Sequence, residues 1–206
     1  MSRYRCLADV ETPRLALRRW SERDLEPLTR LLADPAVMRY LTHEYGPLSR
    51  EQAAHAHARY LTLWRERGFG PWAASDKTTG TWIGKIGLNL LPHWPGPHKV
   101  EVEWQLLPAF WGRGLATEGG RIAIRCGFAD LHLDRIISVT VPANVASWRV
   151  MEKCGLLHQG PLLLTGPLTM QTREVVWYAI DRAKWELQTE ANEGSYRVGV
   201  AGPNRA

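Results

Sequence analysis

The pattern of hydrophobic and polar positions predicts two helices in the first third of the chain. Residues 15–20 alternate between apolar and polar side chains, as a half-buried strand does. After Ser21, leucines recur at helical spacing until Asp-Pro interrupts the pattern at 34–35. A second helix is expected between Ser49 and Gly68. Both serines stand three residues ahead of an acid or amide side chain, which is the capping-box arrangement that begins a helix.

From residue 70 onward the period becomes that of strands. Two stretches, 72–75 and 82–88, flank turn-forming residues and predict a hairpin. Residues 99–106 alternate again, with apolar side chains on one side and two glutamates and a glutamine on the other. The remaining pattern predicts a helix at 116–129, a strand at 135–141, a helix at 144–154, strands near 157–164 and 171–180, and a terminal helix at 181–188.

These elements predict a single α/β domain. The chain has 206 residues, enough for one sizeable core, and no repeat or linker divides it. Residues 1–188 are expected to form the domain. Residues 189–206 are polar and glycine-rich and are expected to be a frayed tail.

Composition and charge exclude several classes. The 26 Lys and Arg residues exceed the 21 Asp and Glu residues, so the charge of +5 favours an anionic partner, while no basic run points to nucleic acid. No apolar run approaches the roughly 20 residues of a membrane span, and the start resembles no secretory signal, so a cytoplasmic protein is expected. Three cysteines without metal spacing indicate reduced, buried thiols.

The most informative segment follows the strand that ends at Leu106. Residues 111–116 are Trp-Gly-Arg-Gly-Leu-Ala, so a turn with two glycines precedes a helix. Such a turn can aim several backbone N–H groups at one point, and the helix dipole adds partial positive charge there. Pyrophosphate suits this site, and an ordinary tight turn is the alternative. The spacing matches neither the three-glycine dinucleotide pattern nor a Walker loop.

This segment resembles the acyl-CoA motif of the GNAT acetyltransferase superfamily, Gln/Arg-x-x-Gly-x-Gly/Ala, although Trp111 departs from its first position. Trp-Gly-x-Gly-x-Ala-Thr-Glu-Ala is typical of the RimJ/RimL-like branch, and here Gly119 replaces the last alanine. The resemblance covers residues 12–187, where further segments similar to that branch follow in order: Thr12-Pro13-Arg14-Leu15, Asp34-Pro35, Ile83-Gly84-Lys85-Ile86-Gly87 and Asn144-Val145-Ala146-Ser147-Trp148.

The resemblance implies a GNAT-type α/β fold, with a mixed, splayed central sheet flanked by helices. Acetyl-CoA, the co-substrate, would enter between the strand ending at Leu106 and the strand at 135–141. The implied activity is acetyl transfer to a primary amine by direct attack in a ternary complex. The acceptor would be a protein N-terminal α-amine or a small-molecule amine, and a homodimer is compatible with the resemblance.

The same resemblance implies the cofactor-binding residues. Backbone groups of Leu106 and Leu107 would pair with the pantetheine arm like an added strand. Asn144 would hydrogen-bond that arm, cap its own helix, or do both. The pyrophosphate would be held by amides in the run Trp111, Gly112, Arg113, Gly114, Leu115 and Ala116, with the hydroxyl of Thr117 nearby.

Acetyl transfer also needs a proton donor for the departing thiolate. Many GNAT enzymes use a tyrosine, but Met151 occupies that position and cannot donate. Ser147 is the candidate acid beside the cofactor; the alternative is a serine hydrogen-bonded to backbone in the first helical turn. Met151 also motivates a rival function, a CoA-binding regulatory or ribosome-associated module with little or no catalysis.

The candidate bases are Glu101 and Glu103, which share one strand face. Repulsion between two carboxylates can raise one pKa toward neutrality. The alternative is a solvated strand face, or a salt bridge to Arg113 or Lys99.

Loop 89–98 lies just before this strand and is expected to border the acceptor pocket with Trp94. His93 and His98 have no third ligand near in sequence, so no metal site is expected.

Overall fold

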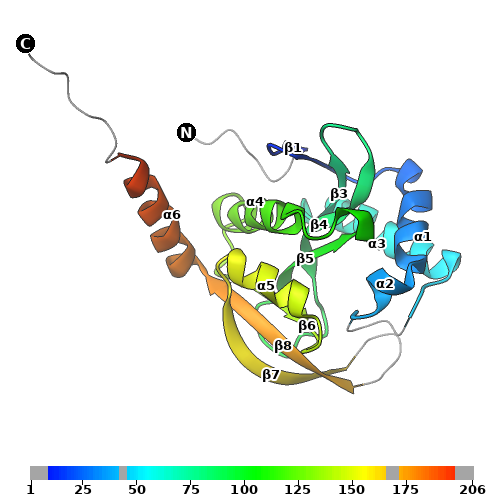
Figure 1. Cartoon of the computed structure of the whole chain (residues 1–206). Coiled ribbons are helices and arrows are strands. Elements are labelled where there is room, and N and C mark those ends of the chain that lie inside the picture. Colours follow the sequence, from blue (N-terminus) through cyan, green and yellow to red (C-terminus); the bar gives the residue numbers. More distant parts are fainter. Residues whose placement is uncertain (1–8, 42–45, 166–171, 198–206) are drawn as a thin grey trace, which may run out of the picture.

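The computed structural model describes residues 9–41, 46–165 and 172–197, with side chains described up to Glu190. Figure 1 shows one sheet with helices on both faces and a last helix that extends away from the sheet. The strands are β1 (Val10–Glu11), β2 (Leu15–Arg18), β3 (Pro71–Asp76), β4 (Trp82–Leu90), β5 (Val100–Leu106), β6 (Arg135–Thr140), β7 (Leu157–Thr165) and β8 (Thr172–Asp181). The helices are α1 (Leu25–Ala33), α2 (Pro35–Met38), α3 (Arg50–Arg67), α4 (Leu115–Ala129), α5 (Val145–Lys153) and α6 (Arg182–Arg197), with 3₁₀ turns at Glu22–Asp24 and Pro108–Phe110.

The sheet is mixed and splayed, as predicted. Its strand order is β1-β2-β3-β4-β5-β6-β8-β7. Neighbours are antiparallel except β5 and β6, which are parallel and pair only between Glu101 and Ile137. Beyond that pair the two strands diverge, so the sheet opens at the carboxyl end of β5.

The predicted helix ends are confirmed by their caps. Ser49 and Gln52 form the capping box of α3, and Gly68 ends it in the left-handed conformation. Ser21 likewise precedes the first helical segment, and its backbone N–H donates to Asp24 at 2.8 Å. Asp34 both ends α1 and caps the short α2, so the chain turns there without leaving helical structure.

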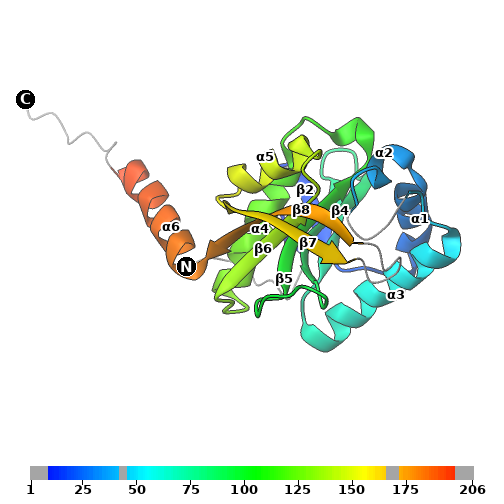
Figure 2. The same ribbon diagram turned by 90° about the horizontal axis from the view of Figure 1, so that it is seen from below.

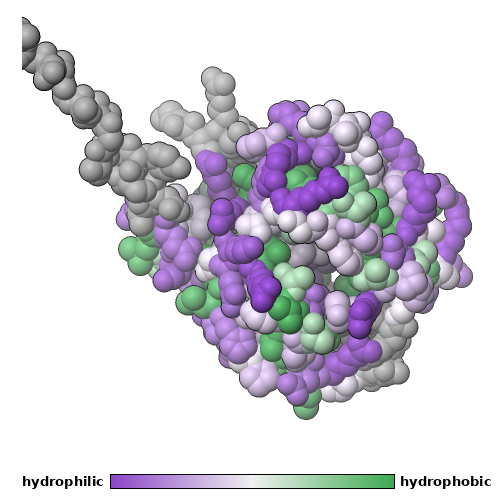
Figure 3. All heavy atoms as spheres, viewed as in Figure 1, coloured by the Kyte–Doolittle hydropathy of each residue, from purple (hydrophilic) through white to green (hydrophobic). Residues whose placement is uncertain are grey.

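Helix α4 packs closely against one face of the sheet. A Cβ at Gly119 would lie 2.8 Å from the Ile86 side chain, so only glycine permits this approach. Lys85, which precedes Ile86 in β4, lies on the opposite face, where its ammonium is 5.1 Å from the ring centre of Tyr60 on α3. Helices α4 and α5 therefore cover one face, while α1 and α3 cover the other (Figures 1 and 2). Seen from the side of α4 and α5, hydrophilic residues surround less polar ones in the middle of the molecule (Figure 3).

The terminal helix is longer than expected. It does not end at Gln188 but runs to Arg197, so residues 189–197 are helical and not frayed. A ring contact of 5.3 Å between Phe128 and Trp185 anchors its first turn to α4. Residues 198–206 lie outside the described residues. Cys154 is a buried free thiol, as expected, and Cys126 is also buried, while Cys6 lies outside the described residues.

Candidate active site

The divergence of β5 from β6 creates a cleft in the middle of the sheet. The Ser138 hydroxyl donates to the Val102 carbonyl oxygen at 2.8 Å where the strands begin to separate, and this bond closes the inner end of the cleft. The cavity measures about 90 Å³. It is lined by Tyr40, Leu41, Glu101, Val102, Glu103, Trp104, Gln105, Ser138, Val139, Thr140, Asn144 and Ser147. Three predicted chemical residues, Glu101, Glu103 and Ser147, therefore lie around one cavity.

The turn before α4 presents a row of free backbone donors. Gly112 and Gly114 have φ values of 72° and 77°, which an L side chain rarely adopts. Gly114 caps α4 in this conformation. Among the described residues, no hydrogen bond uses the amide N–H groups of residues 112–117. Residues 111–114 are also exposed. Free amides beside a helix N-terminus are the physical basis of anion binding.

Backbone groups at the end of β5 are partly engaged within the protein. The Leu107 N–H donates to the Ile83 carbonyl oxygen at 2.8 Å, which continues the pairing with β4. The Leu106 carbonyl oxygen accepts a hydrogen bond of 2.6 Å from the indole Nε1 of Trp111. Trp111 itself is half exposed. Its side chain thus links the end of β5 to the glycine turn.

Helix α5 places Asn144 and Ser147 on the other wall of the cleft. The Asn144 Oδ1 accepts from the Ser147 backbone N–H at 3.3 Å, so Asn144 caps the helix. Its Nδ2 donates to the Thr140 hydroxyl at 3.0 Å. The Ser147 hydroxyl makes no hydrogen bond with any described residue, so the expected alternative, a hydroxyl bonded to backbone, is not what the structure has. Met151, one turn further, is buried in the core.

The carboxylates of β5 belong to a buried charged cluster, not a solvated face. Lys85 is 2% exposed, and its ammonium forms an ion pair with Glu103. The expected alternative partners are therefore wrong: Lys99 instead donates to the Pro92 carbonyl oxygen at 2.8 Å. Glu101 is 8% exposed, and no described residue hydrogen-bonds its carboxylate.

This buried environment shifts the pKa values of Glu101 and Lys85. Burial, together with repulsion from Glu103, raises the pKa of Glu101 to about 8, although Lys85 and Arg59 act in the opposite direction. Burial alone would lower the pKa of Lys85, but attraction to Glu103 outweighs it and holds that pKa above its usual value. Glu101 is therefore a carboxyl group that can exchange a proton near neutral pH.

Several residues of this cleft could not be predicted from the sequence. Lys85 belongs to a segment similar to the family, but nothing in its sequence neighbours shows that it is buried beside Glu103. Gln105 also lines the cleft, and its Oε1 is buried with no hydrogen-bond partner among the described residues. Tyr40 and Leu41 reach it from the segment after α2. Only the alternation of β5, which puts Gln105 on the face of the two glutamates, carried a signal.

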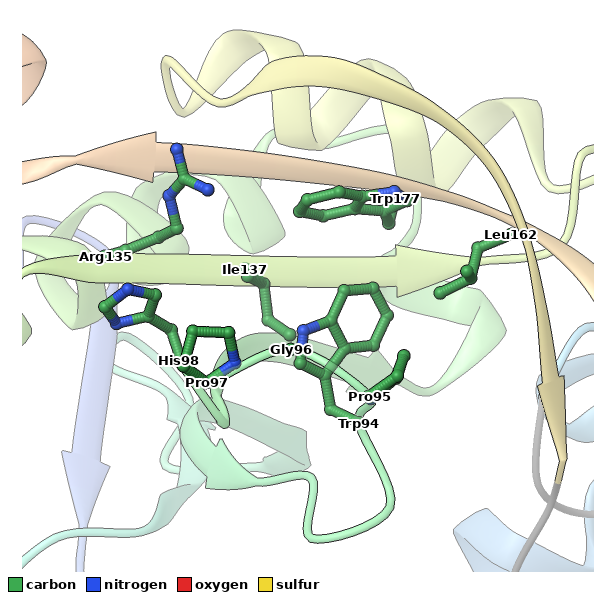
Figure 4. A pocket seen from close by; sticks show the side chains of 9 residues that line it. All are labelled: Trp94, Pro95, Gly96, Pro97, His98, Arg135, Ile137, Leu162 and Trp177. Atoms are coloured by element: carbon green, nitrogen blue, oxygen red, sulfur yellow. The ribbon is translucent and has the colours of Figure 1, made fainter.

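The predicted loop lies at a second cavity instead. Trp94 and Trp177 meet at 5.0 Å between ring centres and, with Ile137 and Leu162, line a cavity of about 170 Å³ (Figure 4). His98 lies at its edge. Trp94 does not line the cleft between β5 and β6 that holds the two glutamates.

Comparison with known proteins identifies the chain as an acyltransferase and gives its family. Residues 14–157 match the family model described as an acetyltransferase (GNAT) domain. The chain therefore belongs to the GNAT acetyltransferase family.

Individual relatives agree with this family. The chain is 30% identical, over 85% of its length and 77% of the relative, to the FsC-acetyl coenzyme A-N(2)-transacetylase of Aspergillus fumigatus. It is also 30% identical to the uncharacterized N-acetyltransferase YoaA of Bacillus subtilis, over 74% of this chain and 85% of that one.

Solved structures share the fold. An acetyltransferase from Agrobacterium tumefaciens superposes with a TM-score of 0.71 at 26% identity, over 87% of this chain and 98% of that one. The aminoglycoside acetyltransferase AAC(6′)-Ib, solved with coenzyme A, has a TM-score of 0.67 at 20% identity, over 85% of this chain and 99% of the other. Within the described ranges, none of the helices has the length and apolar character that crossing a bilayer requires.

Proposed function

We propose that the chain is an acetyl-CoA-dependent N-acetyltransferase of the RimJ/RimL-like branch that acetylates a primary amine. The observation that carries this proposal is the row of free amides at residues 112–117, next to a cleft that holds Glu101 and Ser147. The amides would bind the pyrophosphate of acetyl-CoA. The pantetheine arm would then run into the cleft, where Leu106 and Asn144 would border it and its acetyl group would meet the amine.

The transfer would be direct. The amine nitrogen forms a bond to the acetyl carbonyl carbon, the carbon–sulfur bond breaks, and the amine loses a proton while the thiolate gains one. Glu101 would accept the amine proton, since its carboxyl group has no competing hydrogen bond from a described residue and its pKa is raised to about 8. Glu103, paired with Lys85, would act on Glu101 through its charge. Holding the two substrates together supplies much of the remaining rate.

Ser147 would donate the proton to the thiolate. Its hydroxyl makes no hydrogen bond with a described residue and lies on the α5 wall, opposite the β5 face that carries Glu101. With Met151 buried in the core, Ser147 is the cleft-lining hydroxyl of α5 that can serve the sulfur.

The acceptor is a protein N-terminal α-amine or a small-molecule amine. The names of two relatives bear on this choice. One is named for N(2)-transacetylation, and another, 26% identical over 52% of this chain and 57% of its own, is named a putative ribosomal N-acetyltransferase of Bacillus subtilis.

The position of Met151 favours a second candidate, a CoA-binding module with little catalysis. Both candidates are tested by following free thiol released from acetyl-CoA in the presence of spermidine, 2-phenylethylamine and the tripeptide Ser-Ala-Ala. Thiol release that depends on an amine supports the enzyme. Binding of CoA without amine-dependent release from a broader panel of amines and peptides would favour the module instead.

A further inference from the structure

The turn between β1 and β2 reaches across to the first turn of α4, although about a hundred positions separate them in the sequence. The Thr12 hydroxyl donates to the Glu118 carboxylate at 2.6 Å. The Arg14 backbone N–H donates to the same oxygen at 3.0 Å, and the Arg14 Nε donates to the other at 2.6 Å. Both carboxylate oxygens of Glu118 are thus occupied by one turn of the chain.

Arg14 has a second contact that the ion pair does not require. Its Nη1 donates to the backbone carbonyl oxygen of Arg113 at 2.7 Å, inside the glycine turn. One guanidinium therefore joins the helix, through Glu118, to the peptide bond that precedes Gly114. The planar fork of arginine suits two such acceptors at once, whereas the single ammonium of lysine does not.

The geometry of that peptide bond determines where the next amide points. A trans peptide is planar, and its C=O and N–H groups point in opposite directions. Because the Arg113 carbonyl is held toward Arg14, the N–H of Gly114 is turned to the other side. That N–H has no partner among the described residues. Gly114 has a φ of 77°, which suits glycine, and glycine has no side chain that could fix the turn. The contact from Arg14 supplies that restraint.

Glu118 would otherwise disfavour the cofactor. A carboxylate in the first turn of a helix stabilises the helix, but it repels an anion bound at the same end. Burial tends to raise the pKa of Glu118, and the hydrogen bonds from Thr12 and Arg14 outweigh this and lower it, so the group stays charged. Its side chain is 16% exposed, while that of Arg14 is 51% exposed. An arginine so exposed contributes little as an ion pair alone.

We propose that Arg14, held by Glu118, is a positioning residue that sets the Gly114 amide for the pyrophosphate of acetyl-CoA. This inference rests on the proposed function. It also explains why Thr12-Pro13-Arg14 and Thr117-Glu118 occur together in this chain: each supplies one side of the same contact.

Two variants separate positioning from charge. Glu118→Gln removes a negative charge near the pyrophosphate, so charge alone predicts tighter CoA binding, whereas positioning predicts weaker binding because Arg14 loses its anchor. Arg14→Lys keeps the charge, so charge alone predicts no change, whereas positioning predicts that affinity is lost. Arg14→Met should weaken binding under both models. Lys77→Met is the matched control, since Lys77 pairs with Glu11 at 2.7 Å beside the same turn but does not contact residues 112–117.

The measurement is calorimetric binding of CoA and of pantetheine, which lacks the pyrophosphate. We expect the Kd of CoA to rise about tenfold in Arg14→Met, Arg14→Lys and Glu118→Gln, and less than about twofold in Lys77→Met. Pantetheine affinity should not change. In steady-state assays Arg14→Met, Arg14→Lys and Glu118→Gln should raise the KM for acetyl-CoA and leave kcat unaltered.

The outcomes separate the two levels of the proposal. If wild-type protein does not bind CoA, the proposed function fails. If wild type binds CoA but Arg14→Lys binds equally well, or Glu118→Gln binds more tightly, positioning by Arg14 is wrong. Equal losses for CoA and pantetheine would reveal a general structural defect and also overturn the inference. Urea unfolding of each variant identifies a folding failure, and Arg14→Lys, an exposed conservative change, still decides the question if Glu118→Gln does not fold.

Discussion

The two ends of the cleft use different chemical groups, backbone amides at one end and charged side chains at the other. The glycine turn before α4 is exposed at residues 112–114, and residues 112–117 offer backbone amides from one short stretch of chain. The β5 face is buried and offers side-chain charge, with Glu101 and Glu103 on one strand and Lys85 on its neighbour. The cofactor end therefore depends on backbone conformation. The acceptor side depends on the balance of charges that have been removed from water.

This difference determines how each end should respond to substitution. Backbone donors survive side-chain changes, so only residues that control conformation, such as the glycines and Arg14, should affect them. Buried charges lose their partners when a single side chain is removed, and an unpaired charge in a core is costly. The predictions below test this contrast, from the largest expected effect to the smallest.

Replacing Lys85 should have the largest effect on stability. Lys85→Met leaves the Glu103 carboxylate without its partner beside an already buried Glu101. We expect the free energy of unfolding to fall by about 3–5 kcal/mol, measured by urea denaturation. Lys77→Met, which breaks the exposed pair with Glu11, should cost less than about 1 kcal/mol. Equal costs would mean that the β5 face is not the buried charged cluster described above.

Glu101→Gln should lower kcat about a hundredfold, because the amine loses its proton acceptor. In wild type, kcat should rise as pH increases through about 8, where Glu101 loses its proton. The variant should lack this rise. Glu103→Gln removes the repelling charge and should move the rise to lower pH, because the pKa of Glu101 then falls. An unchanged pH profile in Glu101→Gln would remove Glu101 from the mechanism. The charged groups that shift the pKa of Glu101 are Glu103, Lys85 and, from α3, Arg59.

The same pKa predicts a pH dependence of stability. Unfolded Glu101 ionises near its usual pKa of 4.5, whereas folded Glu101 ionises at about 8. Between these values the folded state holds a proton that the unfolded state releases, so this residue lowers stability progressively as pH rises. Glu101→Gln should therefore stabilise the protein more at pH 9 than at pH 5. Urea unfolding at both pH values would show this, and a gain that shrinks with pH would contradict it.

Two serines that line the cleft should separate catalysis from structure. Ser147→Ala should lower kcat about tenfold with little change in stability, since its hydroxyl bonds to none of the residues that the structure describes. Ser138→Ala should lower the free energy of unfolding by about 1 kcal/mol, since its hydroxyl bonds to Val102. Steady-state kinetics and urea unfolding of both variants give the comparison. Unchanged kcat in Ser147→Ala would exclude it as the acid.

The smallest effect concerns Gly112. Gly112→Ala places a methyl group at a φ of 72°, where it meets no atom within 4 Å, so only backbone strain of about 1 kcal/mol is expected. Gly80→Ala, at a φ of 69° in the β3–β4 turn and also in open space, should cost the same. Calorimetry should show that CoA binding weakens only in Gly112→Ala, because its methyl group obstructs the approach to the amides. Equal CoA affinity would mean that the pyrophosphate binds elsewhere.

The sequence predicts the glycine turn better than the β5 face, because the turn is formed by neighbouring residues. The glycine turn is local, so residues 111–117 and the helix after them could be identified from spacing alone. Helix ends marked by Ser49 and Gly68 were predictable for the same reason. The splay between β5 and β6, by contrast, was implied only by family resemblance, because no local pattern reports that parallel strands separate after one pair.

The charged cluster could not be predicted, because its members meet only in the folded sheet. Lys85 looks like a surface residue until β4 is placed beside β5 and Tyr60 covers it. The contact of Arg14 with Glu118 and Arg113 is equally non-local. The end of α6 was misjudged because polar, glycine-containing sequence looks like a tail, although it continues a helix anchored by Trp185.

The most direct test of the account is a crystal structure of the protein with CoA bound. It should show pyrophosphate oxygens within hydrogen-bond distance of the amides of residues 112–117, and the thiol inside the cleft between Glu101 and Ser147. A pyrophosphate bound away from those amides, or a thiol outside the cleft, would contradict it.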